Sequence, residues 1–140
     1  MKSFRAIVID PEKQTIEMVE TTGSHTETLA LVGASGLDHF RIAEHPTSFD
    51  YGWVDDTGLT GGKPVHAFLF DIRSKEPIAG RCVFIGVDNE TGKTIDARTP
   101  VEFLREHIEW LGPILPEVFW EHTDTGARAI VTYARVKQGR

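Results

Sequence analysis

Short apolar runs that alternate with polar residues and end at turn signals fill most of the chain. Residues 4–9 are mainly β-branched and apolar. Asp10-Pro11 closes this run, because proline fixes its own φ and disfavours helix in the residue before it. Residues 15–20 then alternate between apolar and polar side chains. Together the two segments predict an antiparallel hairpin at the start of a sheet.

Several later segments have the same character and are expected to be extended. Their ranges are 37–43, 65–72, 79–87, 117–123 and 129–136. Residues 79–87 form the most apolar run, which predicts a central strand buried on both faces. Asp124-Thr125-Gly126 is a turn signal, so the last two segments predict a terminal hairpin.

A short helix is predicted after the first hairpin. Ser24 and Glu27 have the spacing of a capping box, in which each side chain accepts a hydrogen bond from a free N–H of the first turn. Leu29, Leu31 and Val32 follow. Gly33 then predicts the end of the helix, since glycine adopts the left-handed conformation without strain.

A second, amphipathic helix is predicted near residue 100. Thr99 is expected to cap it, with Pro100 at the first helical position. Apolar side chains recur at helical spacing from Val101 to Leu111, and Gly112-Pro113 is expected to end the helix. We therefore expect a helix that lies on a sheet.

These elements predict an α+β fold with a mainly antiparallel sheet of about seven to nine strands and two short helices packed on it. The connections are of hairpin length, which disfavours parallel crossovers. Because no linker composition interrupts the pattern, we expect a single domain over residues 1–140.

The net charge of the chain limits the classes of partner that we expect. The formal net charge is −6 at pH 7. Binding to duplex nucleic acid needs clustered Lys and Arg that displace counterions, and the only basic cluster here is the end of the chain. We interpret this cluster as a solvated terminus, and we expect a protein partner or self-association instead.

Cysteine usage and hydropathy predict a cytoplasmic protein. Cys82 is the only cysteine, which excludes an intrachain disulfide, and its apolar neighbours indicate a buried thiol rather than a nucleophile. The apolar run at the N-terminus is shorter than a signal peptide requires. No segment approaches the ~20 apolar residues of a membrane span, so no membrane association is expected.

Several segments together resemble a known family. They are the opening strand with Asp10-Pro11, Ile16-Glu17-Met18-Val19, residues 28–33, Val54-Asp55-Asp56-Thr57-Gly58, and residues 77–86. Over roughly residues 4–88 the chain is similar to small phage- and plasmid-borne proteins known only as a domain of unknown function. It departs from that pattern at residues 64–68 and adds residues 99–140. The resemblance implies a mobile-element setting and supplies no catalytic residues.

The titratable side chains suggest no definite catalytic or metal site. The six histidines are His25, His39, His45, His66, His107 and His122. Neither the His-x-x-x-His nor the His-x-His spacing of metal ligands occurs among them, so no metal or other cofactor is expected. His39, His45 and Asp50 could meet across a loop, although their spacing does not require it.

A carboxylate group of Asp50, Asp55 and Asp56 could serve acid–base catalysis. Acids before Thr57-Gly58 are, however, typical of a solvated turn, because their side chains accept hydrogen bonds from nearby backbone N–H groups. We therefore assign no catalytic residue.

Aromatic residues are the better candidates for binding. Phe103, His107 and Trp110 are expected to form a second stripe along the predicted second helix, facing either Trp120 and Tyr133 of the terminal hairpin or a partner. Tyr51 and Trp53 flank Gly52 in what we expect to be an acidic loop, and they form a second candidate patch.

Three functions follow in order of preference. The first is a non-enzymatic accessory protein that binds, and could inhibit, a host or defence protein through an acidic, aromatic-bearing face. The second is a nucleotide-like small ligand held in a pocket of Trp53, His66 and Arg81. The least favoured is a hydrolase that uses His39, His45 and His66 with acidic residues.

Overall fold

The computed structural model describes residues 2–71 and 76–136, without the side chains of residues 42 and 43. In this part of the chain ten strands and two helices occur. The first strands and helix are β1 (Phe4–Asp10), β2 (Thr15–Thr21), α1 (His25–Val32), β3 (Leu37–His45), β4 (Ser48–Asp55) and β5 (Val65–Phe70). They are followed by β6 (Ile78–Ala79), β7 (Cys82–Asp88), β8 (Thr94–Ile95), α2 (Val101–His107), β9 (Ile108–Thr123) and β10 (Gly126–Arg135).

The predicted α+β, mainly antiparallel fold is confirmed, and the strands form two sheets. Sheet A has the order β2-β1-β7-β4-β3, with β8 paired to the end of β7. Sheet B has the order β10-β9-β5-β6. Every strand pair is antiparallel. The strand number exceeds the predicted range because β6 and β8 are two-residue strands, too short to leave a pattern in the sequence.

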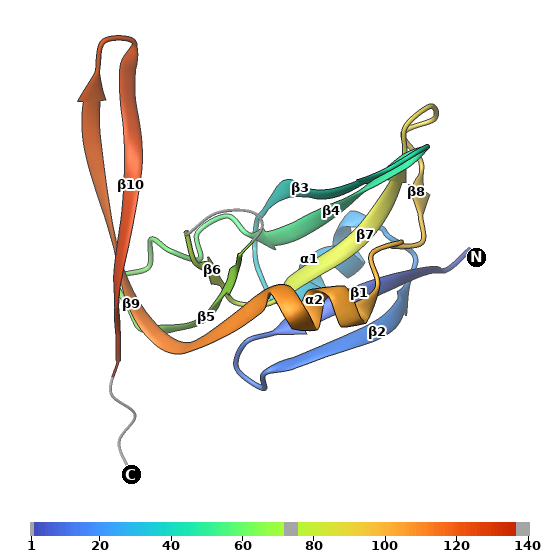
Figure 1. Cartoon of the computed structure of the whole chain (residues 1–140), viewed down its shortest axis with the longest axis horizontal. Coiled ribbons are helices and arrows are strands. Elements are labelled where there is room, and N and C mark those ends of the chain that lie inside the picture. Colours follow the sequence, from blue (N-terminus) through green and yellow to red (C-terminus); the bar gives the residue numbers. More distant parts are fainter. Residues whose placement is uncertain (1, 72–75, 137–140) are drawn as a thin grey trace.

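Sheet A is the middle layer of the molecule (Figure 1). One of its faces packs on α1 through a cluster that includes Ala6, Val32 and Val83. The other face packs on sheet B and α2, where Phe84 meets Phe70 and Leu104 in the larger core cluster. Strand β7 contributes to both clusters, as its continuous apolar run predicted.

The local signals near the N-terminus act as predicted except for one half of the capping box, since Glu27 bonds Thr22 and not an N–H of the first helical turn. β1 and β2 form a hairpin in which Asp10 pairs with Thr15. The Ser24 side chain accepts a hydrogen bond from the Glu27 N–H at the start of α1. The Glu27 carboxylate accepts bonds from the backbone N–H and hydroxyl of Thr22. Gly33 ends the helix at φ 76°.

The predicted cap of the second helix is wrong. Thr99 does not cap α2; Pro100 is at the N-cap position, where it makes no side-chain bond. The Thr99 hydroxyl instead donates to the carboxylate of Asp50, which is fully buried on β4. A buried carboxylate without donors costs more free energy than a helix end near solvent without a side-chain acceptor. The Thr99 hydroxyl therefore points to Asp50.

The predicted length of the second helix is also wrong. α2 ends at His107, and Ile108 begins β9, which pairs with β5. The helical spacing of Ile108 and Leu111 is compatible with both structures over so short a segment. Pairing with β5 satisfies the backbone groups of that strand, and this tertiary contact overrides the local pattern.

The described residues contain no helix that is both long and apolar enough to cross a membrane.

Candidate functional site

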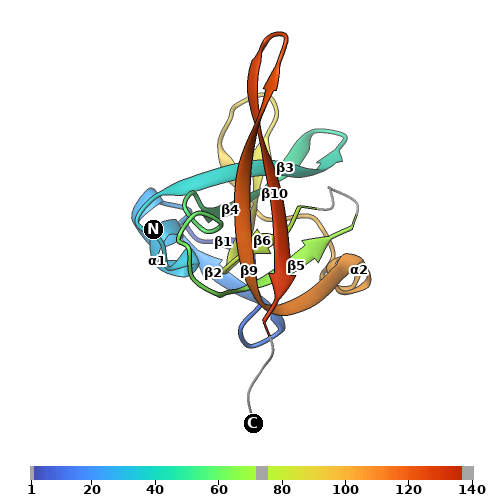
Figure 2. The ribbon, with the colours of Figure 1, turned by 90° about the vertical axis from the view of Figure 1, so that its left-hand side faces the viewer.

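Strand β9 continues far beyond the strand that holds it in sheet B. Its first part pairs with β5 from Ile108 to Ile114, whereas its second part pairs only with β10. The buried side chain of Ile114 and a hydrogen bond from the Val136 N–H to the Pro113 carbonyl (2.9 Å) anchor the root. Residues 115–134 form a two-stranded extension, which we call the arm. It rises beside the rest of the molecule, and its strands twist around each other (Figures 1 and 2).

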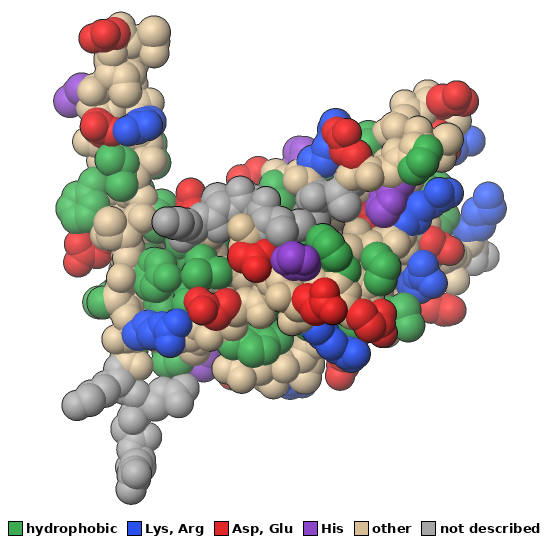
Figure 3. Space-filling model, in the orientation of Figure 1, with side chains coloured by type: hydrophobic (Ala, Val, Ile, Leu, Met, Phe, Trp, Pro, Cys, Tyr) green, Lys and Arg blue, Asp and Glu red, His purple; other side chains and the backbone are tan. Residues whose placement is uncertain are grey.

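The arm exposes large apolar side chains on both faces. Trp120 is 70% exposed and Phe119 is 52% exposed. Consecutive residues of a strand point to opposite faces, so Phe119 points away from the face that carries Trp120. Ile130, 38% exposed, lies directly across from Phe119. Hydrophobic side chains on the side of the arm that faces away from the body are visible in Figure 3.

The other face of the arm borders a cleft of about 510 Å³ between the arm and the body, which we call the arm cleft. The arm contributes two cross-strand pairs to it, Val118 with Val131 and Trp120 with Ala129. This wall is entirely apolar apart from the indole N–H.

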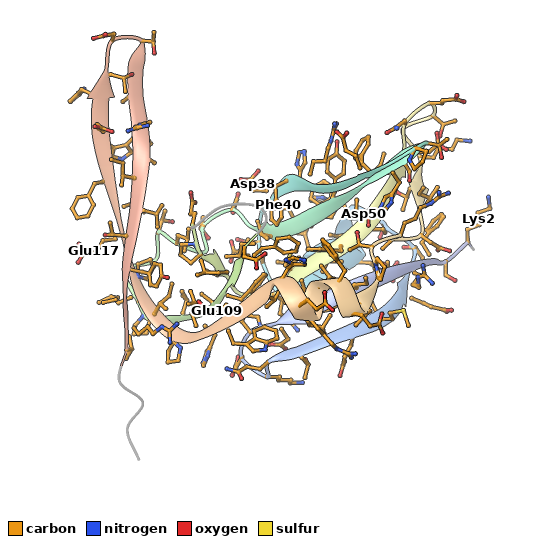
Figure 4. All side chains as sticks on the ribbon, in the orientation of Figure 1. Lys2, Asp38, Phe40, Asp50, Glu109 and Glu117 are labelled. Carbon is orange, nitrogen blue, oxygen red and sulfur yellow. The ribbon has the colours of Figure 1, made fainter. Side chains whose placement is uncertain are left out.

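The body side of the arm cleft combines apolar side chains with several acidic ones. Asp38, Asp55, Asp56 and Glu76 line it, and among the described residues no Lys or Arg does. Phe40 also lines it. Figure 4 shows Asp38 and Phe40 at the part of β3 nearest to the arm, while Asp50 is set further inside.

Local hydrogen bonds hold the acidic turn in place. The Asp55 carboxylate accepts bonds from the N–H and the hydroxyl of Thr57, both at 2.9 Å. The Asp56 N–H donates to the Gly36 carbonyl, which joins the turn to the segment before β3. The bonds to Asp55 are the turn chemistry predicted from the sequence, and together these contacts hold the backbone of the turn that lines the cleft.

Tyr51 and Trp53 belong to a separate aromatic cluster. Their rings lie 6.0 Å apart along one face of β4, and His39 contacts both, at 4.8 Å and 4.9 Å. This is the face of sheet A on which α1 packs, whereas Asp50 points to the opposite face. Tyr51 and Trp53 are half-buried and lie on a strand, not in the predicted loop, whereas His39 is exposed. The role of Tyr51 and Trp53 in binding stays a prediction.

The predicted pocket of Trp53, His66 and Arg81 does not form as one site. His66 and Arg81 line a common concavity of about 640 Å³, but Trp53 does not line it. The Arg81 Nε–H donates to the Val32 carbonyl at the C-terminal end of α1 (3.4 Å). Arg81 therefore helps to hold the helix.

Phe103, His107 and Trp110 do not share one helical stripe. The rings of Phe103 and His107 lie 4.4 Å apart on α2, whereas Trp110 lies on β9 and packs against Phe68 at 6.1 Å. All three are partly buried. Trp120 does not cover them, because it lies on the arm. The binding role of these three residues stays a prediction.

The titratable residues are dispersed. His107 Nδ1 lies 2.7 Å from an Asp71 oxygen, which links the end of α2 to the end of β5. His45 Nε2 approaches Asp50 to 3.6 Å, whereas His39 belongs to the aromatic cluster. Asp50 is also remote from the turn of Asp55 and Asp56. Within the described part of the chain, no three His, Cys, Asp or Glu side chains are placed to hold a metal ion.

Comparison with protein-family models, curated proteins and solved structures finds no match for this chain. Its function is therefore inferred from the geometry of its own clefts and surfaces.

The arm is the feature that sequence reasoning missed. The terminal hairpin was predicted, but Val118, Phe119 and Trp120 were not recognised as an exposed surface. The available signal was three consecutive apolar residues in a strand, which place large side chains on both faces of a hairpin.

Proposed function

We propose that this protein is a non-enzymatic binding protein that holds a basic, apolar-bearing segment of another protein in the arm cleft. The observation that carries the proposal is the pairing of the two walls: an apolar wall with Trp120 faces a wall that carries Asp38, Asp55 and Asp56 and no described Lys or Arg. A partner that inserts an aliphatic or aromatic side chain between Lys or Arg residues would complement both walls.

The exposure of the arm supports a role in recognition. A two-stranded hairpin alone is at best marginally stable in water, and it buries little of its own apolar surface. Trp is strongly enriched among the residues that contribute most to protein interfaces. A partner seated in the arm cleft would cover Trp120 and Val118 and would hold the arm against the body.

If the bound segment belongs to the surface that a host or defence protein uses for its own activity, binding would inhibit that protein. The cytoplasmic location and the mobile-element origin are part of the same proposal. They rest on the composition of the chain and on its resemblance to phage- and plasmid-borne proteins.

Random peptides displayed on phage and selected on the immobilised protein test the proposal. We expect enrichment of peptides with Lys or Arg beside an aromatic or aliphatic residue. Trp120→Ser should weaken their binding about tenfold or more. Phe119→Ser is the matched control, because Phe119 lies on the opposite face of the arm, and it should leave the affinity unchanged.

Charge neutralisation provides an independent test. Asp38→Asn combined with Asp56→Asn should weaken binding and reduce its dependence on salt, since screening acts on exposed charges. Selection of acidic peptides, equal losses from Trp120→Ser and Phe119→Ser, or no enrichment at all would contradict the proposal.

A further inference from the structure

A second concavity, of about 460 Å³, lies between the start of α1, the β7–β8 turn and strand β4. It shares no lining residue with the arm cleft. Its apolar wall consists of Leu37, Phe49, Tyr51, Trp53, Ile85 and Val87. Its volume is in the range of small-molecule sites. We call it the aromatic pocket.

Strand alternation builds the aromatic wall. Phe49, Tyr51 and Trp53 occupy every second position of β4, so their rings project from one face of sheet A. The Phe49 and Tyr51 rings lie 4.9 Å apart with their planes at 74°. α1 contacts both β4 and β7 on this face, and Phe49, Tyr51 and Trp53 remain partly exposed.

A cation of the chain itself already rests on this wall. The guanidinium carbon of Arg41 lies 4.0 Å from the centre of the Phe49 ring. This is the geometry of a cation–π contact, in which the negative face of the ring attracts the positive charge. Tyr51 and Trp53, which line the same wall, present the same aromatic chemistry to a cationic ligand.

The charged residue that lines the pocket is negative, the sign that attracts a cation. Asp88 is the only Asp, Glu, Lys or Arg among the lining residues that the structure describes. The backbone N–H groups of Thr91 and Glu90 hold the pKa of Asp88 below its ordinary value, and nearby Arg98 adds a smaller effect in the same direction. Asp88 consequently stays ionised at neutral pH.

We propose that the aromatic pocket binds an organic ammonium group, with the apolar part of the ligand against the β4 rings and the positive charge near Asp88. The ammonium group belongs either to a small molecule or to a lysine side chain. This site is independent of the arm cleft, so it adds a ligand-binding function to the function proposed above.

An anionic ligand such as a nucleotide fits this pocket less well. Within the described part of the chain no Lys or Arg lines it, and the N-terminal turn of α1 is already capped. There the Ser24 side chain accepts a hydrogen bond from the Glu27 N–H, and the Glu27 carboxylate accepts one from the Thr22 N–H. His66 and Arg81, the other residues of the predicted nucleotide site, line a different concavity.

The test compares a cation with its uncharged isostere. Choline and 3,3-dimethylbutan-1-ol have the same shape but differ in charge, and N-acetyl-lysine methylamide presents the ammonium of a side chain. Binding is followed by NMR through the three indole N–H signals, assigned with single Trp→Phe variants. We expect saturable shifts of the Trp53 signal with choline or the lysine derivative, and unchanged signals of Trp110 and Trp120.

Single substitutions separate the two recognition elements. Phe49→Leu keeps an apolar wall without the ring and should weaken cation binding about threefold to fivefold. Asp88→Asn preserves a side-chain acceptor for the turn and should weaken binding about threefold. Glu90→Gln is the matched control, because Glu90 lies in the same turn and does not line the pocket; it should have no effect.

The more tightly bound of the two cations identifies the source of the ammonium group. Equal binding of 3,3-dimethylbutan-1-ol and choline would overturn the proposal, as would unchanged choline affinity in both Phe49→Leu and Asp88→Asn. Absence of a saturable Trp53 shift at millimolar cation would also overturn it, whatever the outcome of the peptide selection at the arm cleft.

Discussion

Replacing Asp50 by alanine should destabilise the fold more than replacing a carboxylate in an exposed turn. The side chain is completely buried on β4. It accepts hydrogen bonds from the Thr99 N–H (2.8 Å), from the Thr99 hydroxyl and from the Arg98 N–H (3.2 Å). Through these bonds it fastens the segment between β8 and α2 to sheet A.

The magnitude follows from the groups left without a partner. Both Thr99 donors are buried, and an orphaned buried polar group costs about 1–3 kcal/mol. Alanine no longer buries a carboxylate, which offsets part of this loss. We therefore expect Asp50→Ala to lower the free energy of unfolding by about 3 kcal/mol.

Urea denaturation, followed by circular dichroism and tryptophan fluorescence, measures this change. Asp55→Ala is the control, because Asp55 makes two comparable hydrogen bonds in a surface turn, and we expect a loss of about 1 kcal/mol or less. The urea dependence should stay unchanged in both variants, which would show that the unfolding reaction is the same. A loss for Asp50→Ala no larger than that for Asp55→Ala would refute the reasoning.

Three further substitutions test other features of the fold. Ser48→Ala should raise the free energy of unfolding by about 1 kcal/mol in the same urea assay, because the Ser48 hydroxyl is buried and makes no hydrogen bond to the part of the chain that the structure describes. A decrease would contradict this expectation. Gly33→Ala should lower that free energy by about 1–2 kcal/mol, since φ is 76° and the added methyl would displace the Arg81 guanidinium, whereas unchanged stability would show that the helix end relaxes freely. For Asp88 the folded-state pKa lies below its ordinary value of 3.8, so its contribution is present above that value and is lost as pH falls through the folded-state pKa. Asp88→Asn should thus make stability fall less steeply in acid, and urea denaturation at a series of acidic pH values would reveal an unchanged slope if this is wrong.

The first hairpin and helix were predictable, whereas β4 (Ser48–Asp55), expected to be an acidic loop, is a strand of sheet A between β7 and β3. The β1–β2 hairpin depends on Asp10-Pro11, and α1 depends on Ser24, Glu27 and Gly33. In each case the residues that specify the structure lie within a few positions of the structure they specify. The backbone geometry that they favour is then the same in the isolated segment and in the fold.

The candidate sites were less predictable. Tyr51 and Trp53 were identified as a patch, but their neighbours His39, Phe49 and Asp88 come from other positions and strands. The arm cleft joins carboxylates and an apolar hairpin more than 40 positions apart along the chain. Side-chain type indicates what a residue can do, whereas strand pairing decides which residues meet.

The sequence alone therefore determined the first hairpin, the first helix, the antiparallel character and the apolar central strand, because these follow from local backbone preference and hydrophobic periodicity. Only the tertiary structure decided that helix changes to strand at Ile108 and that the Thr99 hydroxyl donates to Asp50. It also decided that the arm extends beyond the end of β5. Each of these depends on a buried donor, acceptor or strand edge contributed by a distant segment. The free energy of satisfying those groups exceeds the small local preferences that a sequence pattern records.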